Sequence, residues 1–227
     1  MKETLKKILK EIHLYNFIKN IKKYYKNKIF KKNAPNILIL LRDILEKNNI
    51  CYWVEYGTLL GTIRENKIID YDYDIDIGVL ESKIDKVKLE KVLEKNGFKK
   101  ISEISLNGKI TENKYKYKKL KIGIDFYFFY EEENKIKGYC YGNLQNLTYT
   151  ETLKKLNGLV AYECIFKKFN IGRYEIYGKE IKIPQNYNEH LIEYYGENYM
   201  IPDKEWLQEN AKNIKKINEV GKIKIYE

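Results

Sequence analysis

The sequence has little of several residues on which large classes of protein depend. Its 227 residues include three cysteines and two histidines. Cys51, Cys140 and Cys164 are an odd number and show no Cys-x-x-Cys spacing, which argues against a disulfide framework and against a zinc site. With only His13 and His190, a histidine-centred mechanism or a zinc hydrolase is not supported. We therefore expect reduced thiols in a cytoplasmic protein.

Long apolar runs and prolines are also missing. No stretch reaches the roughly 20 apolar residues of a membrane span, and lysines occupy the N-terminal positions where a secretion signal has its apolar segment. Three prolines exclude a proline-rich linker, and 44% apolar residues exclude a disordered chain. The length predicts one enzyme-sized domain with an appendage.

Positive charge is present in excess, and it is concentrated at the N-terminus. Residues 1–32 contain eleven lysines and two glutamates, so they carry +9 of the net charge of +11. Apolar residues recur there at steps of three and four, namely Leu5, Ile8, Leu9, Ile12, Tyr15, Ile18 and Ile21. This spacing predicts a basic amphipathic helical arm over residues 1–33. The arm suits peripheral contact of residues 1–32 with an anionic membrane, and the alternative is packing on the body or on a second subunit.

The rest of the chain, residues 34–227, predicts a single α+β domain. Ala34-Pro35 predicts the end of the arm, because proline suits a first helical turn better than a helix interior. Helices are predicted over 36–49, 57–66, 81–97, 184–199 and 202–220, and strands over 51–56, 72–80, 98–106, 114–121, 122–130, 135–142 and within 162–184. We expect a mixed β-sheet flanked by helices.

The strand over residues 72–80 carries acids where strands rarely have them. Asp72, Asp74 and Asp76 alternate with larger apolar residues and therefore project from one face. Such like charges repel unless a cation neutralises them, and Mg²⁺ or Mn²⁺ prefers carboxylate oxygens. We predict Asp74, Asp76 and Asp125, from a neighbouring strand, as metal ligands and catalytic residues. The alternatives are a solvated edge strand for the first acids and a lysine partner for Asp125.

A glycine-containing turn precedes this strand. In Tyr56-Gly57-Thr58-Leu59-Leu60-Gly61 the first glycine lets a phosphate approach the backbone, and the helix start offers N–H groups. An arginine one to two turns further on can hold the same phosphate. The predicted donor- and phosphate-binding residues are Gly57, Thr58, Leu59, Gly61, Arg64 and Asp72.

Taken together, ILEKNNICYWVEYGTLLGTIRENKIIDYDYDIDIGV and the C-terminal YGKEIKIPQNYNEHLIEYYGENYMIP resemble the LicD family, whose relatives include fukutin and fukutin-related protein. The resemblance extends over about residues 37–202. It implies a DNA polymerase beta-like nucleotidyltransferase fold. One departure is Tyr73, which stands where the family has an acid between Asp72 and Asp74, so any contact that this acid makes to donor or acceptor is in question.

The resemblance also implies a reaction. A phosphorylated alcohol (phosphocholine, glycerol phosphate or ribitol phosphate) would pass from a CDP-linked donor such as CDP-choline to a sugar hydroxyl of a bacterial surface glycan or glycolipid, as in lipopolysaccharide or capsule biosynthesis, with release of CMP. Asp74 and Asp76 would hold Mg²⁺ on the pyrophosphate, while Asp125 would complete the metal site or take the acceptor proton.

Two other functions stay open at this point. One is a nucleotidyltransferase that moves NMP from an NTP onto a small molecule, protein or RNA. The other is a non-catalytic protein that uses the basic arm on RNA or lipid. We expect no specific nucleic-acid partner, and we expect the chain to work on the inner face of the cytoplasmic membrane of a bacterium.

Overall fold

The computed structural model describes residues 2–203 and 205–226, with side chains described from residue 20 onward. The α-helices of this part are α1 (Lys2–Lys47), α2 (Tyr56–Glu65), α3 (Lys86–Lys95), α4 (Tyr149–Leu156) and α5 (Tyr187–Tyr195). The strands are β1 (Trp53–Val54), β2 (Asp74–Leu80), β3 (Phe98–Leu106), β4 (Lys109–Tyr117), β5 (Ile122–Glu131), β6 (Lys135–Gly142), β7 (Leu159–Lys167), β8 (Ile171–Ile176), β9 (Lys179–Pro184) and β10 (Ile214–Ile225). Two 3₁₀ turns, η1 (Glu81–Lys83) and η2 (Gln208–Asn210), complete the order.

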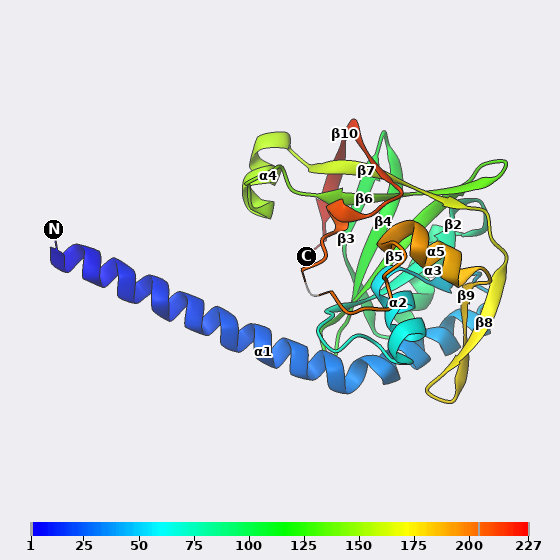
Figure 1. The fold of residues 1–227 in the computed structure, drawn as a ribbon. Coiled ribbons are helices and arrows are strands. Elements are labelled where there is room, and N and C mark those ends of the chain that lie inside the picture. The colour runs from blue at the N-terminus through cyan, green and yellow to red at the C-terminus, as the bar shows by residue number, and fades with distance from the viewer. Residues whose placement is uncertain (1, 204, 227) are drawn as a thin grey trace.

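Eight strands form one sheet in the order β1-β2-β5-β4-β3-β10-β7-β6. Because β6 also pairs with β5, the strands from β5 to β6 close into a barrel (Figure 1). The α+β class and the mixed sheet are confirmed, but most of the sheet closes into a barrel, which the sequence did not predict. Gly138 makes the closure possible, since a Cβ at this position of β6 would lie 2.6 Å from the ring of Phe129 on β5.

The two remaining strands of the sheet extend it beyond the barrel. β2 runs parallel to β5, with Asp76 opposite Asp125, and β1 pairs antiparallel with β2. The chain between β2 and β5 contains α3, which buries Leu89 and Leu93, as expected for a connection between parallel strands. This topology brings together acids that lie far apart in the sequence.

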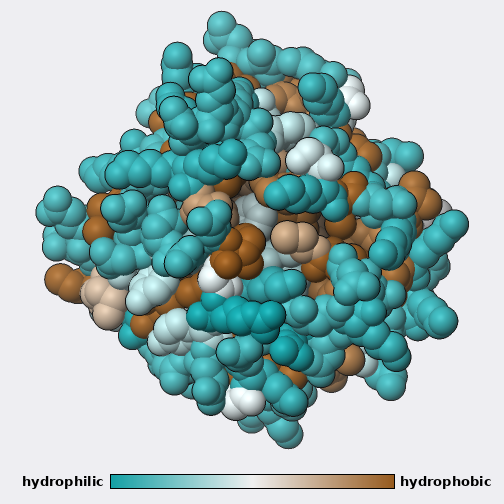
Figure 2. Space-filling view, turned by 90° about the vertical axis from the view of Figure 1, so that its right-hand side faces the viewer, coloured by the Kyte–Doolittle hydropathy of each residue, from teal (hydrophilic) through white to brown (hydrophobic). Residues whose placement is uncertain are grey.

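A separate hairpin, β8–β9, packs beside α5 at one end of the molecule. Its turn contains Tyr177 and Gly178 with φ of 53° and 70°, the left-handed backbone that two-residue hairpin turns favour. The hairpin lies on the right in Figure 1. Figure 2 shows that face, on which hydrophilic residues predominate and apolar residues gather around a central hollow.

The C-terminal region confirms one predicted helix and corrects another. α5 lies within the predicted range 184–199, but residues 202–220 contain η2 and the first half of β10 in place of a helix. Ile214, Ile217 and Val220 are three residues apart, which mimics a helical period. β10 tolerates this spacing because its pairing with β7 is interrupted by a register shift between Lys216 and Val220.

The N-terminal helix is also longer than predicted. α1 continues through Pro35, so the expected break at Ala34-Pro35 is wrong, and the predicted domain boundary between residues 33 and 34 falls inside this helix. A proline inside a helix costs about 3 kcal/mol. Leu38, Leu41 and Leu45 follow it and are at most 1% exposed. Since each fully buried leucine contributes about 1.5–3 kcal/mol, their burial outweighs the cost.

The N-terminal half of α1 projects away from the body of the molecule (Figure 1). From residue 20 onward its lysines are exposed, as are Tyr24 and Tyr25. Of the apolar face predicted from Leu5 to Ile21, the side chains up to Ile18 lie outside the described residues, and Ile21 is exposed. Within the described part of the chain, no helix is long and apolar enough to cross a membrane.

We expect the two halves of α1 to contribute very differently to stability. Leu41→Ala should lower the free energy of unfolding by about 2–5 kcal/mol, because it leaves a cavity in the core. The control Tyr24→Ala, at a side chain that is 63% exposed, should change it by less than about 0.5 kcal/mol. Urea denaturation followed by circular dichroism measures both values. Equal losses would contradict the division of α1 into a buried and a projecting half.

Candidate active site

The aspartates of β2 and of the residues before it form a compact cluster. Asp72, Asp74 and Asp76 each offer one carboxylate oxygen to a group in which these atoms lie within 4.8 Å of one another. Asp76 is buried, and the other two are half-buried. The alternation predicted from the sequence therefore places the three acids together. Asp70 lies apart from them, because its carboxylate pairs with Lys31 at 2.6 Å and Lys67 at 3.1 Å.

Burial and mutual repulsion make this cluster unfavourable as bare anions. Burial raises the pKa of Asp74 to about 6, and the Asp72 charge adds to the effect while Lys114 and Lys26 oppose it. The pKa of Asp76 is raised well above its usual value by burial and by the charge of Asp74. Three oxygen donors at this separation can hold a hard divalent cation, which would relieve the repulsion.

Asp125 lies beside the cluster and has a cation of its own. It stands opposite Asp76 in the pairing of β2 with β5, and opposite Lys114 in the pairing of β5 with β4. The Lys114 Nζ lies 2.5 Å from Asp125 Oδ2 and 2.8 Å from Glu112 Oε1. Burial raises the pKa of Asp125 to about 6 even though Lys114 opposes the shift. The structure thus brings Asp125 to the site, while the group of atoms within 4.8 Å contains Asp72 in its place.

The start of α2 packs tightly against these acids. A Cβ at Gly57 would lie 2.6 Å from Asp72 Oδ2 and 3.3 Å from Asp76 Oδ2, so a side chain at this position would force the Asp72 carboxylate to shift. The Thr58 hydroxyl is fully buried and accepts a hydrogen bond of 2.8 Å from the Asp76 backbone N–H. Gly57 and Thr58 therefore fix the position of β2 relative to α2.

The other predicted residues of the turn lie further from the acids. Leu59 is fully buried in the hydrophobic core. Gly61 allows a close approach of the following loop, because a Cβ there would lie 2.6 Å from the carbonyl oxygen of Lys67. The structure does not bring these two residues to the aspartate cluster.

A buried polar network behind α2 was not predicted. Glu55 accepts hydrogen bonds from the Tyr56 backbone N–H, at the start of α2, and from the Trp53 indole. The His190 Nε2 lies 2.7 Å from Glu55 Oε1, and its ring stacks on Phe166 at 4.0 Å. His190 is thus a packed residue of α5. Trp53 is fully buried, so it belongs to the core and is not a surface on which a ligand stacks.

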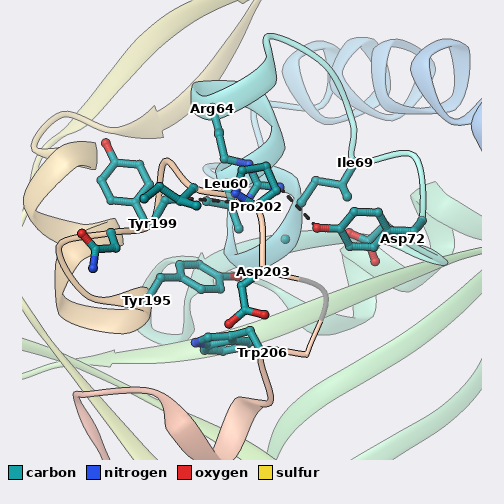
Figure 3. A pocket seen from close by; sticks show the side chains of 13 residues that line it. Leu60, Arg64, Ile69, Asp72, Tyr195, Tyr199, Pro202, Asp203 and Trp206 are labelled. Atoms are coloured by element: carbon teal, nitrogen blue, oxygen red, sulfur yellow. Dashed lines mark hydrogen bonds between the residues drawn. The ribbon is translucent and has the colours of Figure 1, made fainter.

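Arg64 faces a cavity of about 570 Å³ on one side of the cluster (Figure 3). Its guanidinium pairs with Glu65 at 2.8 Å and reaches the hydroxyl of Tyr71 at 3.4 Å. Apolar and aromatic side chains form most of the remaining wall. The residues that line the cavity are Gly57, Leu60, Arg64, Ile69, Tyr71, Asp72, Tyr195, Asn198, Tyr199, Ile201, Pro202, Asp203 and Trp206. The combination offers an arginine and aromatic rings next to carboxylates.

A second, smaller cavity of about 180 Å³ lies directly at the acids and is lined by Asp72, Asp76 and Tyr127, among others. The Tyr127 hydroxyl lies 3.5 Å from Asp76 Oδ1. Sequence reasoning did not single out Tyr127, Lys114 or Trp206. Strand pairing brings the first two to the site. Lys114 is the kind of partner that the sequence analysis left open as an alternative for Asp125, although it did not say which lysine.

Comparison with known proteins agrees with this geometry. Residues 49–157 match the sequence model of the family described as LicD/FKTN/FKRP, nucleotidyltransferase domain. The matched segment contains the turn of α2, the aspartate cluster, Lys114 and Asp125.

The chain is also similar to individual proteins. An uncharacterized protein of Rickettsia typhi is 32% identical over 161 residues, which are 70% of this chain and 45% of the relative. The human ribitol-5-phosphate transferase FKTN is 27% identical over 188 residues, which are 78% of this chain and 35% of the relative. Among solved structures, a lincomycin-bound lincosamide antibiotic adenylyltransferase aligns with a TM-score of 0.42 and 14% identity over 68% of this chain and 82% of that chain.

The chain therefore matches about a third to a half of the length of these curated relatives. Their similarity supports an assignment of the family.

We expect Gly57→Ala to weaken divalent-metal binding by about 10- to 100-fold, because the added Cβ displaces carboxylates that would hold the ion. Electron paramagnetic resonance of Mn²⁺ titrations measures the affinity. Ile63→Ala is the matched control on α2, since its side chain packs on the core. Wild-type Mn²⁺ affinity in the Gly57→Ala variant would contradict the close packing of Gly57 against the acids.

Proposed function

Residues 49–157 form a LicD-family domain, and we propose that the chain transfers a phosphorylated alcohol from a CDP-linked donor to a sugar hydroxyl of a glycan or glycolipid, releasing CMP. The observation that carries this proposal is the packing of Asp72, Asp74 and Asp76 at the start of α2, beside a cavity that combines Arg64 with aromatic rings. The human relative is named a ribitol-5-phosphate transferase, and this supports a phosphorylated alcohol as the transferred group.

The cavity of about 570 Å³ suits the nucleotide part of the donor. Tyr195 and Trp206 offer ring faces to a pyrimidine base. Arg64 and the N-terminal end of α2 offer positive charge and N–H groups to the phosphates. The phosphates would then lie next to Asp72, which lines both this cavity and the smaller one.

The acids fit a divalent cation in their geometry and chemistry. We assign Asp72, Asp74 and Asp76 as its ligands, because their oxygens lie within 4.8 Å of one another. When bound, Mg²⁺ or Mn²⁺ would neutralise charge on the pyrophosphate as the bond to CMP breaks. Thr58 and Gly57 keep the ligands in place through the backbone of β2.

Asp125 is assigned to the acceptor. Its carboxylate would take the proton of the attacking sugar hydroxyl while the new oxygen–phosphorus bond forms and CMP leaves with the electrons of the broken bond. Lys114 orients this carboxylate, because its Nζ lies 2.5 Å from Asp125 Oδ2. The same lysine offsets the negative charge of Glu112.

Asp74→Asn should lower CMP release by about 10²–10⁴-fold, since loss of metal-supplied charge stabilisation costs several kcal/mol. Purified protein is assayed with CDP-choline, CDP-glycerol, CDP-ribitol and CDP-ethanolamine, with and without Mg²⁺. Asp70→Asn is the matched control, because Asp70 belongs to the same acidic run but pairs with Lys31 and Lys67. Its activity should stay near that of the wild type.

The same assay separates the proposed reaction from its main rival. Release of pyrophosphate from CTP or ATP, without CMP release from any CDP-alcohol, would favour nucleotidyl transfer. An active Asp74→Asn variant would overturn the assignment of the site.

The projecting half of α1 suits peripheral contact with an anionic membrane, where glycolipid acceptors are found. Lys22, Lys23, Lys26, Lys28 and Lys32 are all exposed. Each lysine near an anionic surface contributes about 1 kcal/mol of attraction, which falls with salt. We include this contact in the proposal as the way in which the chain approaches its acceptor.

Changing Lys22, Lys28 and Lys32 together to Glu should weaken binding to phosphatidylglycerol vesicles by about 100-fold or more, at about 1 kcal/mol for each lysine. Sedimentation with vesicles measures the bound fraction, and phosphatidylcholine vesicles should bind neither protein. The matched control changes Lys135, Lys154 and Lys155, which are exposed on β6 and α4. Equal weakening in both variants would mean that net charge alone, and not α1, decides the binding.

A further inference from the structure

The barrel contains a cavity that the proposed donor site does not use. Its volume is about 440 Å³. All the barrel strands contribute to its wall, with Ser102 from β3, Lys114 from β4, Tyr127 from β5, Tyr141 from β6, Leu159 from β7 and Ile223 from β10. Small barrels are usually filled by side chains or hold one small ligand. We call this space the barrel lumen.

The barrel lumen communicates with the aspartate cluster. Tyr127, Cys140 and Gln208 line both the lumen and the small cavity at Asp76. β5 and β6 pair only at Tyr130–Lys137 and Glu131–Ile136 in the described structure, so the barrel wall is unpaired between them nearer Tyr127. Lys114 lines the lumen while its Nζ contacts Asp125. The lumen therefore reaches Lys114, the direct partner of Asp125, to which the acceptor proton is assigned.

Charge and side-chain chemistry indicate what the lumen binds. Its charged residues are Lys114, Glu112 and Glu209, and the lysine is already matched by Glu112 and Asp125. Negative charge thus prevails, which disfavours phosphates. Ser102, Tyr141, Tyr149 and Gln208 add hydroxyl groups, ring faces and an amide. Such a wall suits a neutral, hydroxyl-rich molecule, whose hydroxyls can donate to carboxylates.

The geometry of the reaction gives this molecule a role. In an in-line displacement the attacking hydroxyl and the leaving group lie on opposite sides of the phosphorus. The small cavity at the acids shares Gly57, Asp72 and Trp206 with the proposed nucleotide cavity, and Tyr127 with the lumen. The acids therefore lie between the two larger cavities.

We propose that the barrel lumen is the acceptor subsite, which binds one neutral sugar residue with its reactive hydroxyl toward Asp125. The role of the bound sugar as the acceptor rests on the proposed function. The binding of a neutral sugar in the lumen is tested independently of it.

The proposal is tested with a variant in which a bulky side chain blocks the lumen. Ser102→Trp places a large ring inside it, and the matched control Ser105→Trp adds the same ring three residues further along β3, outside the lumen. Saturation-transfer NMR measures the binding of methyl hexosides and methyl N-acetylhexosaminides to each protein. In parallel, CMP release from the best CDP-alcohol is measured with and without the glycoside.

We expect the wild type and Ser105→Trp to bind at least one neutral glycoside and Ser102→Trp to bind none. The ratio of CMP release with glycoside to release without it should fall to one in Ser102→Trp. Glu209→Gln is a milder second variant in case Ser102→Trp does not fold. It should weaken glycoside binding by about 3- to 10-fold, because one hydrogen bond to a charged group becomes a neutral one.

Three results would overturn the proposal. The first is that the wild type binds no glycoside. The second is that glycoside binding is unchanged in both Ser102→Trp and Glu209→Gln. The third is that these variants lose binding of the CDP-alcohol but keep binding of the glycoside. If the lumen variants abolish glycoside binding but no CDP-alcohol yields CMP, the proposed function fails while the lumen stands as a sugar site.

Discussion

The packing of three carboxylates against a helix start is the constraint on which the rest of the site depends. Asp72, Asp74 and Asp76 repel one another, and burial makes this repulsion more costly. The fold holds them through backbone contacts, since Thr58 binds the Asp76 N–H and Gly57 leaves room for two of the carboxylates. These contacts keep the three carboxylates close together, with oxygens within 4.8 Å of one another, although their charges repel.

The strand topology places chemically different surroundings on the two sides of this cluster. The parallel pairing of β2 with β5 places Asp125 beside Asp76, and the antiparallel pairing of β5 with β4 adds Lys114. The C-terminal region after α5 supplies Trp206 and the aromatic wall on one side, while the closed barrel supplies a polar lumen on the other. Barrel closure thus encloses one of the two larger cavities beside the acids, and in the proposed function this cavity is the place for the acceptor.

The parts that sequence reasoning predicted are those that depend on local pattern. The i, i+2 alternation of strands places Asp74 and Asp76 on one face whatever the rest of the chain does, and the turn at Gly57 lies next to them in sequence. Lys114 and Trp206 reach the site through long-range pairing and packing, for which a single sequence carries no signal. At Val220 the local pattern itself misled the prediction. Its helix-like spacing from Ile214 comes from an irregular strand.

The departure at Tyr73 connects the arm with the site. Tyr73 lies between Asp72 and Asp74, so its side chain projects to the other side of the chain from these two acids. Here the Tyr73 ring lies 5.2 Å from the Lys26 ammonium of α1, a distance at which an aromatic face attracts a cation. Lys26 in turn lowers the pKa of Asp74 and Asp125 against the effect of burial. The Tyr73 ring therefore links α1 to the segment between Asp72 and Asp74, and the lysine that it contacts acts electrostatically on Asp74 and Asp125.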